Sequence, residues 1–170
     1  MTDAFDPAAL PTVDLDPLAR LRVLSRVLDG TAMTEAVLDV PFERFWPWLS
    51  DLERSVPAFD RDVWRLRVLA RDGDRWRVRA WPAPVAFTVD VRPGWVWMHS
   101  PIYAVGMAAV PAGAERTRVG HLEGVPAGGP RWLQRIESPL LRLSRAYVRG
   151  HVVRDVAGMA RALGTRVVPP

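Results

Sequence analysis

Residues 139–163, PLLRLSRAYVRGHVVRDVAGMARAL, decide the fold because they predict one long helix with a single apolar face. Ser138 can cap this helix, and Pro139 suits its first position, where a missing N–H costs nothing. Gly164 can end it. The apolar residues recur at intervals of three, four and seven: Leu141, Val148, Val152, Val156, Met159 and Leu163. A shorter helix is expected over 130–137. The long helix needs a large apolar surface to lie on.

The preceding residues predict an antiparallel sheet that supplies this surface. There are seven strand candidates: 31–40, 63–71, 75–81, 85–91, 95–100, 102–110 and 115–125. Apolar and polar residues alternate in most of them, and most clearly at 63–71 and 75–81. The sequence Asp-Gly-Asp at 72–74 is typical of a hairpin turn between two of them. Two short helices, over 41–50 and 51–56, follow the first strand. We therefore expect an α+β fold, in which a curved sheet of about seven strands surrounds the long C-terminal helix.

An additional helix is predicted near the N-terminus, over residues 17–29. Asp16 suits its N-cap and Pro17 its first position. Leucines recur on one face, so we expect the helix to pack on the domain or on a partner subunit, which would make a homodimer. A basic amphipathic helix on a membrane surface is the alternative, although this helix is short for that role. The chain is thus divided into an arm and helix (1–30), a folded domain (31–164) and a tail (165–170).

The composition excludes several classes of protein. The chain has no cysteine and only 3 histidines, so we expect no disulfide, no metal site and no cofactor. No apolar run approaches the roughly 20 residues of a membrane helix, and the N-terminus lacks the basic region of a secretory signal. The expected location is the cytoplasm, without stable membrane insertion. The net charge of +4 is weak evidence for nucleic acid, and the phosphate-loop, dinucleotide, nucleophile-elbow and metal-helix motifs are absent.

Four short motifs resemble one known family. They are PFERFW at 41–46, LSDLE at 49–53, RPGWVW at 92–97 and ERTRV at 115–119. With the proline-broken terminal helix, they resemble the START-like helix-grip superfamily, also called SRPBCC, and within it the bacterial polyketide cyclase/dehydrase-like and lipid-transport members. The resemblance covers about residues 31–164. It implies a cavity between sheet and helix, but not its chemistry, because carriers, receptors and enzymes share this scaffold.

The last predicted strand carries a pair of residues suited to acid–base chemistry. His121 and Glu123 are two residues apart, so their side chains point the same way. Arg116 and Arg118 lie on the opposite face, which indicates that the pair faces inward. A buried histidine beside a carboxylate can act as general acid and base, with Tyr103 as a third candidate. The competing interpretation is that the pair lies partly solvated at the strand end, without a catalytic role.

Further residues are predicted to line the cavity, although each could also be ordinary core or surface. The apolar candidates are Trp46, Phe59, Trp64, Trp76, Phe87, Trp97 and Met107. The polar candidates are His99, Tyr147 and His151. Tryptophan and arginine alternate at 64–67 and 75–79, which places them on opposite strand faces. A stacking platform for nucleic acid needs both on one face, so no nucleic-acid partner is expected.

The sequence leaves open whether the protein is an enzyme. The first hypothesis is that it binds a hydrophobic small molecule, lipid- or polyketide-like, in the cavity. The alternative is a polyketide cyclase, aromatase or dehydratase that uses the same cavity, with His121 and Glu123 as the acid–base pair. A third hypothesis gives the N-terminal helix an interaction role. An enzyme needs at least two polar groups that converge on one point, whereas a carrier needs only an apolar cavity and one anchoring group.

Overall fold

The computed structural model describes residues 15–28, 30–82, 85–101, 103–124 and 139–168, with side chains placed from 147 onward in the last range. In chain order its elements are α1 (Pro17–Val27), β1 (Thr31–Leu38), α2 (Phe42–Ser50), α3 (Leu52–Phe59), β2 (Arg65–Asp72), β3 (Arg75–Trp81), β4 (Val85–Arg92), β5 (Trp95–His99), β6 (Ala104–Pro111), β7 (Thr117–Gly124), α5 (Pro139–Ala162) and β8 (Val167–Val168). The helix predicted over 130–137 lies outside the described residues.

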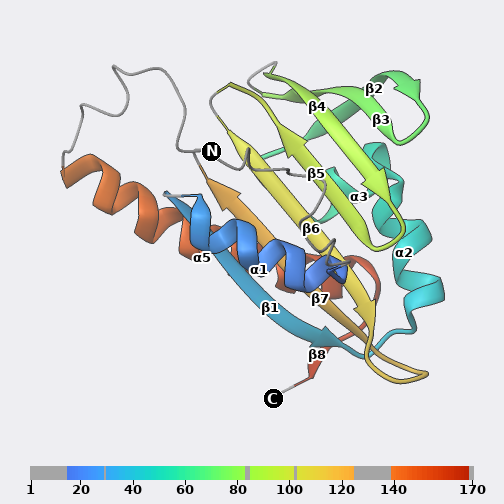
Figure 1. Ribbon diagram of the computed structural model, residues 1–170. Coiled ribbons are helices and arrows are strands. Elements are labelled where there is room, and N and C mark those ends of the chain that lie inside the picture. The colour runs from blue at the N-terminus through green and yellow to red at the C-terminus, as the bar shows by residue number, and fades with distance from the viewer. Residues whose placement is uncertain (1–14, 29, 83–84, 102, 125–138, 169–170) are drawn as a thin grey trace, which may run out of the picture.

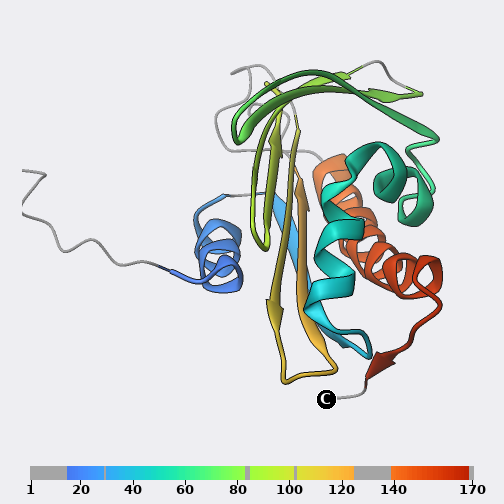
Figure 2. The same cartoon turned by 90° about the vertical axis from the view of Figure 1, so that its right-hand side faces the viewer.

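All the strands belong to one antiparallel sheet, in the order β2-β3-β4-β5-β6-β7-β1-β8. The sheet curves around α2, α3 and α5, while α1 lies on its opposite, outer face (Figures 1 and 2). The α+β helix-grip fold is thus confirmed. The short strand β8 pairs with β1 and adds an eighth strand within the segment expected to be a tail. No helix among the described residues combines the length and apolarity needed to cross a membrane.

The apolar face predicted on the long helix lies in the core. Val152, Val156 and Met159 are each at most 3% exposed and face the concave side of the sheet. Gly164 follows the helix with φ +63°, a left-handed conformation that glycine adopts without strain, and the helix ends there as expected. The helix predicted over 51–56 extends further than expected, to Phe59. This longer α3 brings an aromatic ring and the following residues to the concave side.

Helix α5 approaches α3 closely at Gly158. A Cβ atom there would lie 2.4 Å from the carbonyl oxygen of Phe59. We expect Gly158→Ala to lower the free energy of unfolding by about 1–3 kcal/mol, because the two helix backbones must separate. Urea denaturation followed by circular dichroism measures the change.

Gly150→Ala is the matched control for Gly158→Ala. Gly150 is in the same helix, but a Cβ there would meet only the end of the Arg154 side chain, at 3.8 Å. Because alanine favours a helix over glycine by about 1 kcal/mol, this control should be unchanged or more stable. Equal stabilities of the two variants would contradict the close approach.

Helix α1 packs on the outer face of its own sheet. Leu18 and Leu21 are at most 2% exposed and lie against Gly106 and Gly120. A Cβ atom on Gly106 would come within 2.5 Å of Leu21, and one on Gly120 within 2.6 Å of Leu18, so the missing side chains make room for the helix. Of the two packing partners expected for this helix, the domain is the one observed. A homodimer through α1 stays a prediction.

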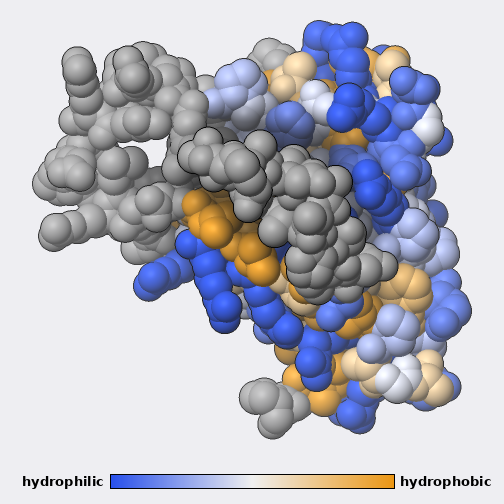
Figure 3. All heavy atoms as spheres, in the orientation of Figure 1, coloured by the Kyte–Doolittle hydropathy of each residue, from blue (hydrophilic) through white to orange (hydrophobic). Residues whose placement is uncertain are grey.

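The outer face beyond α1, over β2 and β3, is mainly hydrophilic (Figure 3). Arg67 and Arg79 lie directly opposite each other there, and both are exposed. Strand β2 ends the described sheet on this side. The backbone N–H of Val68 donates a hydrogen bond to Glu53 of α3 at 2.8 Å, and the pairing with β3 shifts between Val68 and Ala70.

Candidate functional site

A cavity of about 300 Å³ lies between the concave face of the sheet and helices α3 and α5. Most of its wall is apolar, and Val56, Phe59, Leu66, Phe87, Met98 and Met107 contribute to it. Polar groups gather in one part of the wall, where Asp60, Tyr103, His121, Glu123 and His151 lie. An apolar pocket with a few convergent polar groups is typical of a small-molecule site.

Strand β7 directs two of these polar side chains inward. His121 and Glu123 are 0% and 2% exposed, and both line the cavity. Leu122 lies between them in sequence, and its side chain points to the outer face under α1. Gly120, just before His121, also lies under α1. The structure therefore places the pair inside, as the alternation along the strand indicated, and not partly solvated at the strand end.

Five side chains form what we call the carboxylate–imidazole cluster: Asp60, His121, Glu123, His151 and Asp155. His121 Nε2 lies 3.1 Å from Glu123 Oε1 and 3.1 Å from Asp155 Oδ2. His151 Nε2 lies 3.1 Å from Glu123 Oε2, 3.3 Å from Asp155 Oδ2 and 3.8 Å from Asp60 Oδ1. All five residues are at most 7% exposed. The cluster joins β7, α5 and the end of α3 across the core.

Tyr103 extends the cluster toward the cavity. Its hydroxyl donates a hydrogen bond to Glu123 Oε2 at 2.8 Å. Burial, together with the charge of Glu123, raises the pKa of this hydroxyl, so Tyr103 keeps its proton. Among the described residues, His121 Nδ1 has no hydrogen-bond partner.

The contacts set the charge of the two imidazoles. Burial alone would lower the pKa of His121, but its hydrogen bonds with Asp155 and Glu123 outweigh burial and raise the pKa to about 10. The hydrogen bond with Glu123 raises the pKa of His151 to about 9 against the effect of burial. Burial would raise the pKa of Glu123, and its hydrogen bonds with the two imidazoles lower it to about 2 instead. Two buried cations thus accompany the buried carboxylates.

Asp60 differs from the other carboxylates of the cluster. Burial and the nearby charge of Asp155 raise its pKa to about 6, although the backbone N–H of Asp62 donates to it at 2.8 Å. A group with a pKa near neutrality exchanges its proton most readily under physiological conditions. Asp60 is therefore the member of the cluster best suited to accept and return a proton.

Part of the cluster could also hold a divalent cation. Asp60, Glu123, His151 and Asp155 each offer one ligand atom, and these four atoms lie within 4.8 Å of one another. Carboxylate oxygens with one imidazole nitrogen suit several divalent metals. Nε2 of His151 is the nitrogen that faces the carboxylates, so it is the atom that would bind the metal. This nitrogen can hold either a proton or a metal ion, but not both at once.

The structure brings together eight of the thirteen residues predicted for the site. The eight that line the cavity are Phe59, Phe87, Tyr103, Met107, His121, Glu123, Tyr147 and His151. The five that lie elsewhere are Trp46, Trp64, Trp76, Trp97 and His99.

Three of these five lie on or beside α2, β2 and β3. Trp46 stacks on Phe42 within α2, with ring centroids 6.4 Å apart, and packs at the edge of the core. Trp64 precedes β2 and is 62% exposed. Trp76 lies at the β2–β3 hairpin, under the guanidinium of Arg71 at 4.3 Å.

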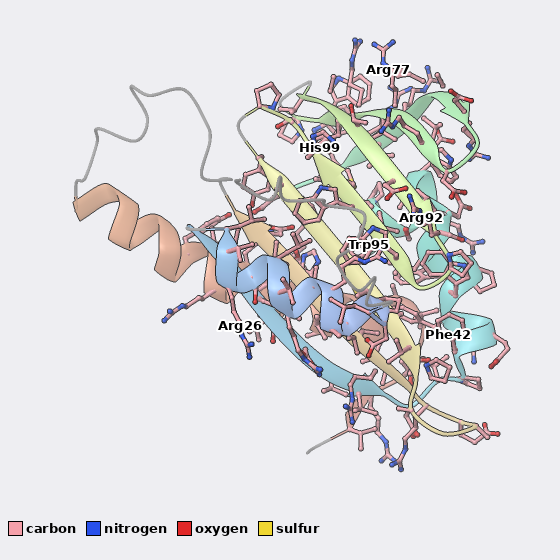
Figure 4. All side chains as sticks on the ribbon, viewed as in Figure 1. Arg26, Phe42, Arg77, Arg92, Trp95 and His99 are labelled. Carbon is pink, nitrogen blue, oxygen red and sulfur yellow. The ribbon has the colours of Figure 1, made fainter. Side chains whose placement is uncertain are left out.

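Trp97 and His99 point to the outer face because β5 has the opposite orientation to the one expected. Val96 and Met98 point inward and are 0% and 4% exposed. Trp97 stacks on Trp95 beside α1, and His99 lies on the same face of the strand (Figure 4).

Sequence reasoning missed two members of the cluster, Asp60 and Asp155. Asp155 lies three residues after Val152 and four before Met159, so this carboxylate falls on the apolar face of the long helix. A charge on such a face was a usable signal for a buried polar site. Asp60 had no comparable signal, because it was expected to lie beyond the end of a short helix.

No known protein family matches this chain by sequence, and no curated protein sequence matches it. Several solved structures resemble it. The protein TTHA0849 from Thermus thermophilus is 19% identical, over 78% of this chain and 96% of that chain, with a TM-score of 0.57. The Zhui aromatase/cyclase from Streptomyces sp. R1128 is 14% identical, over 78% and 90%, with a TM-score of 0.54. A START superfamily protein from Mycobacterium smegmatis is 15% identical, over 79% and 99%, with a TM-score of 0.53.

These similarities confirm the fold that the motifs indicated. The chain has the START-like helix-grip fold, which it shares with the START superfamily protein and with the Zhui aromatase/cyclase. At such identities the likeness extends to the fold alone, because this scaffold carries many functions. The function has to be argued from the cavity and its cluster.

Proposed function

We propose that this protein binds a hydrophobic small molecule, lipid- or polyketide-like, with an oxygen function placed against the carboxylate–imidazole cluster. The observation that carries the proposal is the apolar cavity of about 300 Å³ with polar groups in one part of its wall. The apolar wall favours the body of the ligand by removing its surface from water. The polar groups favour one orientation, since a buried oxygen needs hydrogen-bond partners.

A variant that fills the cavity tests this proposal. Met107 lines the cavity and is 1% exposed. We expect Met107→Trp to weaken the binding of octan-1-ol at least about tenfold, or about 1.4 kcal/mol, because the larger side chain takes the place of the ligand. Isothermal titration calorimetry measures the affinity, and circular dichroism confirms that the variant is folded.

The control for Met107→Trp is Trp64→Ala, which changes an exposed side chain outside the cavity. This variant should bind octan-1-ol as the wild type does. Equal affinity of the wild type and Met107→Trp would refute binding in the cavity. Native mass spectrometry of protein purified from its own host then identifies the molecule that occupies it.

The cluster also favours a second candidate, a polyketide cyclase, aromatase or dehydratase. The supporting observation is that Asp60, Tyr103, Glu123 and His151 converge at one part of the cavity, as an acid–base enzyme requires. In the dehydration of a β-hydroxy ketone, a carboxylate of the cluster would take the proton from the carbon next to the carbonyl. An imidazolium would protonate the departing hydroxyl, which leaves as water and gives the enone.

The residues of the cluster would divide this work by position. Four members of the cluster line the cavity, and of these His151 and Asp60 are the more exposed, at 6% and 7%. The closest ionisable atoms of His151 and Asp60 are 3.8 Å apart. His121 is completely buried and uses Nε2 to contact both Glu123 and Asp155. His121 with Glu123 therefore supplies the fixed charge, and His151 with Asp60 supplies the groups that reach a substrate.

A further inference from the structure

A second cavity, of about 260 Å³, adjoins the first on the other side of His151. It lies between the segment after α3 and the exposed side of α5. Three arginines line it: Arg61, Arg154 and Arg161. We call it the basic groove. The groove and the first cavity share Phe59, Asp62 and His151, so the two spaces meet at these residues.

The acidic side chains of the groove already have partners. Asp62 accepts a hydrogen bond from the hydroxyl of Tyr147 at 2.5 Å and lies 3.4 Å from His151 Nδ1. Asp155 contacts both imidazoles of the carboxylate–imidazole cluster. Among the described residues, neither carboxylate forms an ion pair with an arginine of the groove.

The arginines, in contrast, form no ion pair with any residue that the structure describes. Arg154 lies over the ring of Tyr147, 5.6 Å from its centroid, and its Nη2 is 3.4 Å from His151 Nδ1. This stacking holds the guanidinium at the junction of the two cavities. Arg161 lies two helical turns further along the same side of α5.

We propose that the basic groove binds an anionic group, a carboxylate or a phosphate, of the molecule whose apolar part occupies the first cavity. The ligand is then an anionic amphiphile, and its polar junction passes His151. Guanidinium groups bind both kinds of anion through paired, charge-assisted hydrogen bonds. The inference rests on the proposed function for the apolar part of the ligand. For the anionic part it rests on three arginines that have no ion-pair partner among the described residues.

Three probes with the same alkyl chain test the groove: octyl phosphate, octanoate and octan-1-ol. Calorimetry compares them in the wild type and in the triple variant Arg61→Gln/Arg154→Gln/Arg161→Gln. We expect the wild type to bind one of the anions at least about tenfold more tightly than the alcohol, and to lose this preference as salt is added. The triple variant should lose the preference and keep its affinity for octan-1-ol. Octanoate and octyl phosphate distinguish carboxylate from phosphate.

The matched control is Arg67→Gln/Arg77→Gln/Arg79→Gln, which removes the same charge from the exposed outer face of β2 and β3. It should retain the preference for the anion. The groove is refuted if the wild type binds neither anion more tightly than octan-1-ol, or if the preference survives in the groove variant. Binding of octan-1-ol alone upholds the cavity and refutes the groove. If an anion binds through the arginines but octan-1-ol does not bind, the groove is upheld and binding in the apolar cavity is refuted. If no probe binds, the groove and the cavity are both refuted.

Discussion

Replacement of His121 by leucine should lower the free energy of unfolding by about 3–5 kcal/mol. The imidazole is completely buried and lies 3.1 Å from a carboxylate oxygen of Glu123 and of Asp155, which are each 2% exposed. Leucine has a similar size but no charge, so the two carboxylates lose one of their cations inside the core. Urea denaturation followed by tryptophan fluorescence and by circular dichroism measures the loss.

Two further variants show whether this loss comes from the buried charges. Asp62→Asn changes a carboxylate that is 57% exposed, and it should alter stability by no more than about 0.5 kcal/mol. The triple variant His121→Leu/Glu123→Leu/Asp155→Leu removes both carboxylates with the imidazole and should recover part of the loss. A His121→Leu protein as stable as the wild type would show that the contacts contribute nothing.

His151→Gln should reduce the rate of dehydration of a β-hydroxy ketone by about 10²–10⁴-fold, if the cluster is catalytic. Glutamine keeps a hydrogen-bonding group beside Glu123 but cannot deliver a proton to a departing hydroxyl. A suitable probe is 4-hydroxy-4-phenylbutan-2-one, whose enone product absorbs in the ultraviolet. The KM should change little, because the apolar wall supplies most of the binding.

The control for this experiment is again Trp64→Ala, since that exposed side chain touches neither the cavity nor the cluster. Its rate should equal that of the wild type. Unchanged turnover in His151→Gln, or no turnover of the probe by the wild type, would argue against the acid–base candidate. Neither result would bear on the proposal that a hydrophobic molecule binds in the cavity.

The sequence predicted the elements that have local signals. Asp16 caps α1 through the backbone N–H of Ala19 at 2.9 Å, and Gly73 makes the β2–β3 turn with φ +53°. The inward direction of His121 was predictable because Arg118 on the other face must reach water. In these cases one or two neighbouring residues determine the structure, so no knowledge of the remaining fold is needed.

The orientation of β5 was not predictable in this way. Its sequence, WVWMH, has large apolar residues at both alternating positions, so alternation does not distinguish the two faces. The outer face is apolar at this strand because α1 covers it: Trp95 is 4% exposed and packs with Leu18 and Leu21. Once a helix covers each side of a sheet, the pattern that separates inside from outside is lost.

The cluster depends on contacts between distant parts of the chain. Asp60 and His121 are brought to one place by α3 and β7, and α5 adds His151 and Asp155. Residue spacing along one element predicted that His121 and Glu123 are neighbours. It contained no information on which other elements would meet this pair. The contacts of the pair with His151 and Asp155, and the place of Asp60 beside them, were therefore found only in three dimensions.

The terminal position of β2 bears on how this protein behaves at high concentration. An uncovered outermost strand invites a strand from another molecule, and extension of the sheet in this way leads to fibrous precipitates. In this chain the backbone N–H of Val68 already donates a hydrogen bond to Glu53, so it cannot pair with another strand. The register shift before Ala70 interrupts regular pairing along β2. If two such strands met edge to edge, exposed arginines such as Arg65 and Arg67 would also repel each other. These three features discourage polymerisation at the outermost strand of the described sheet.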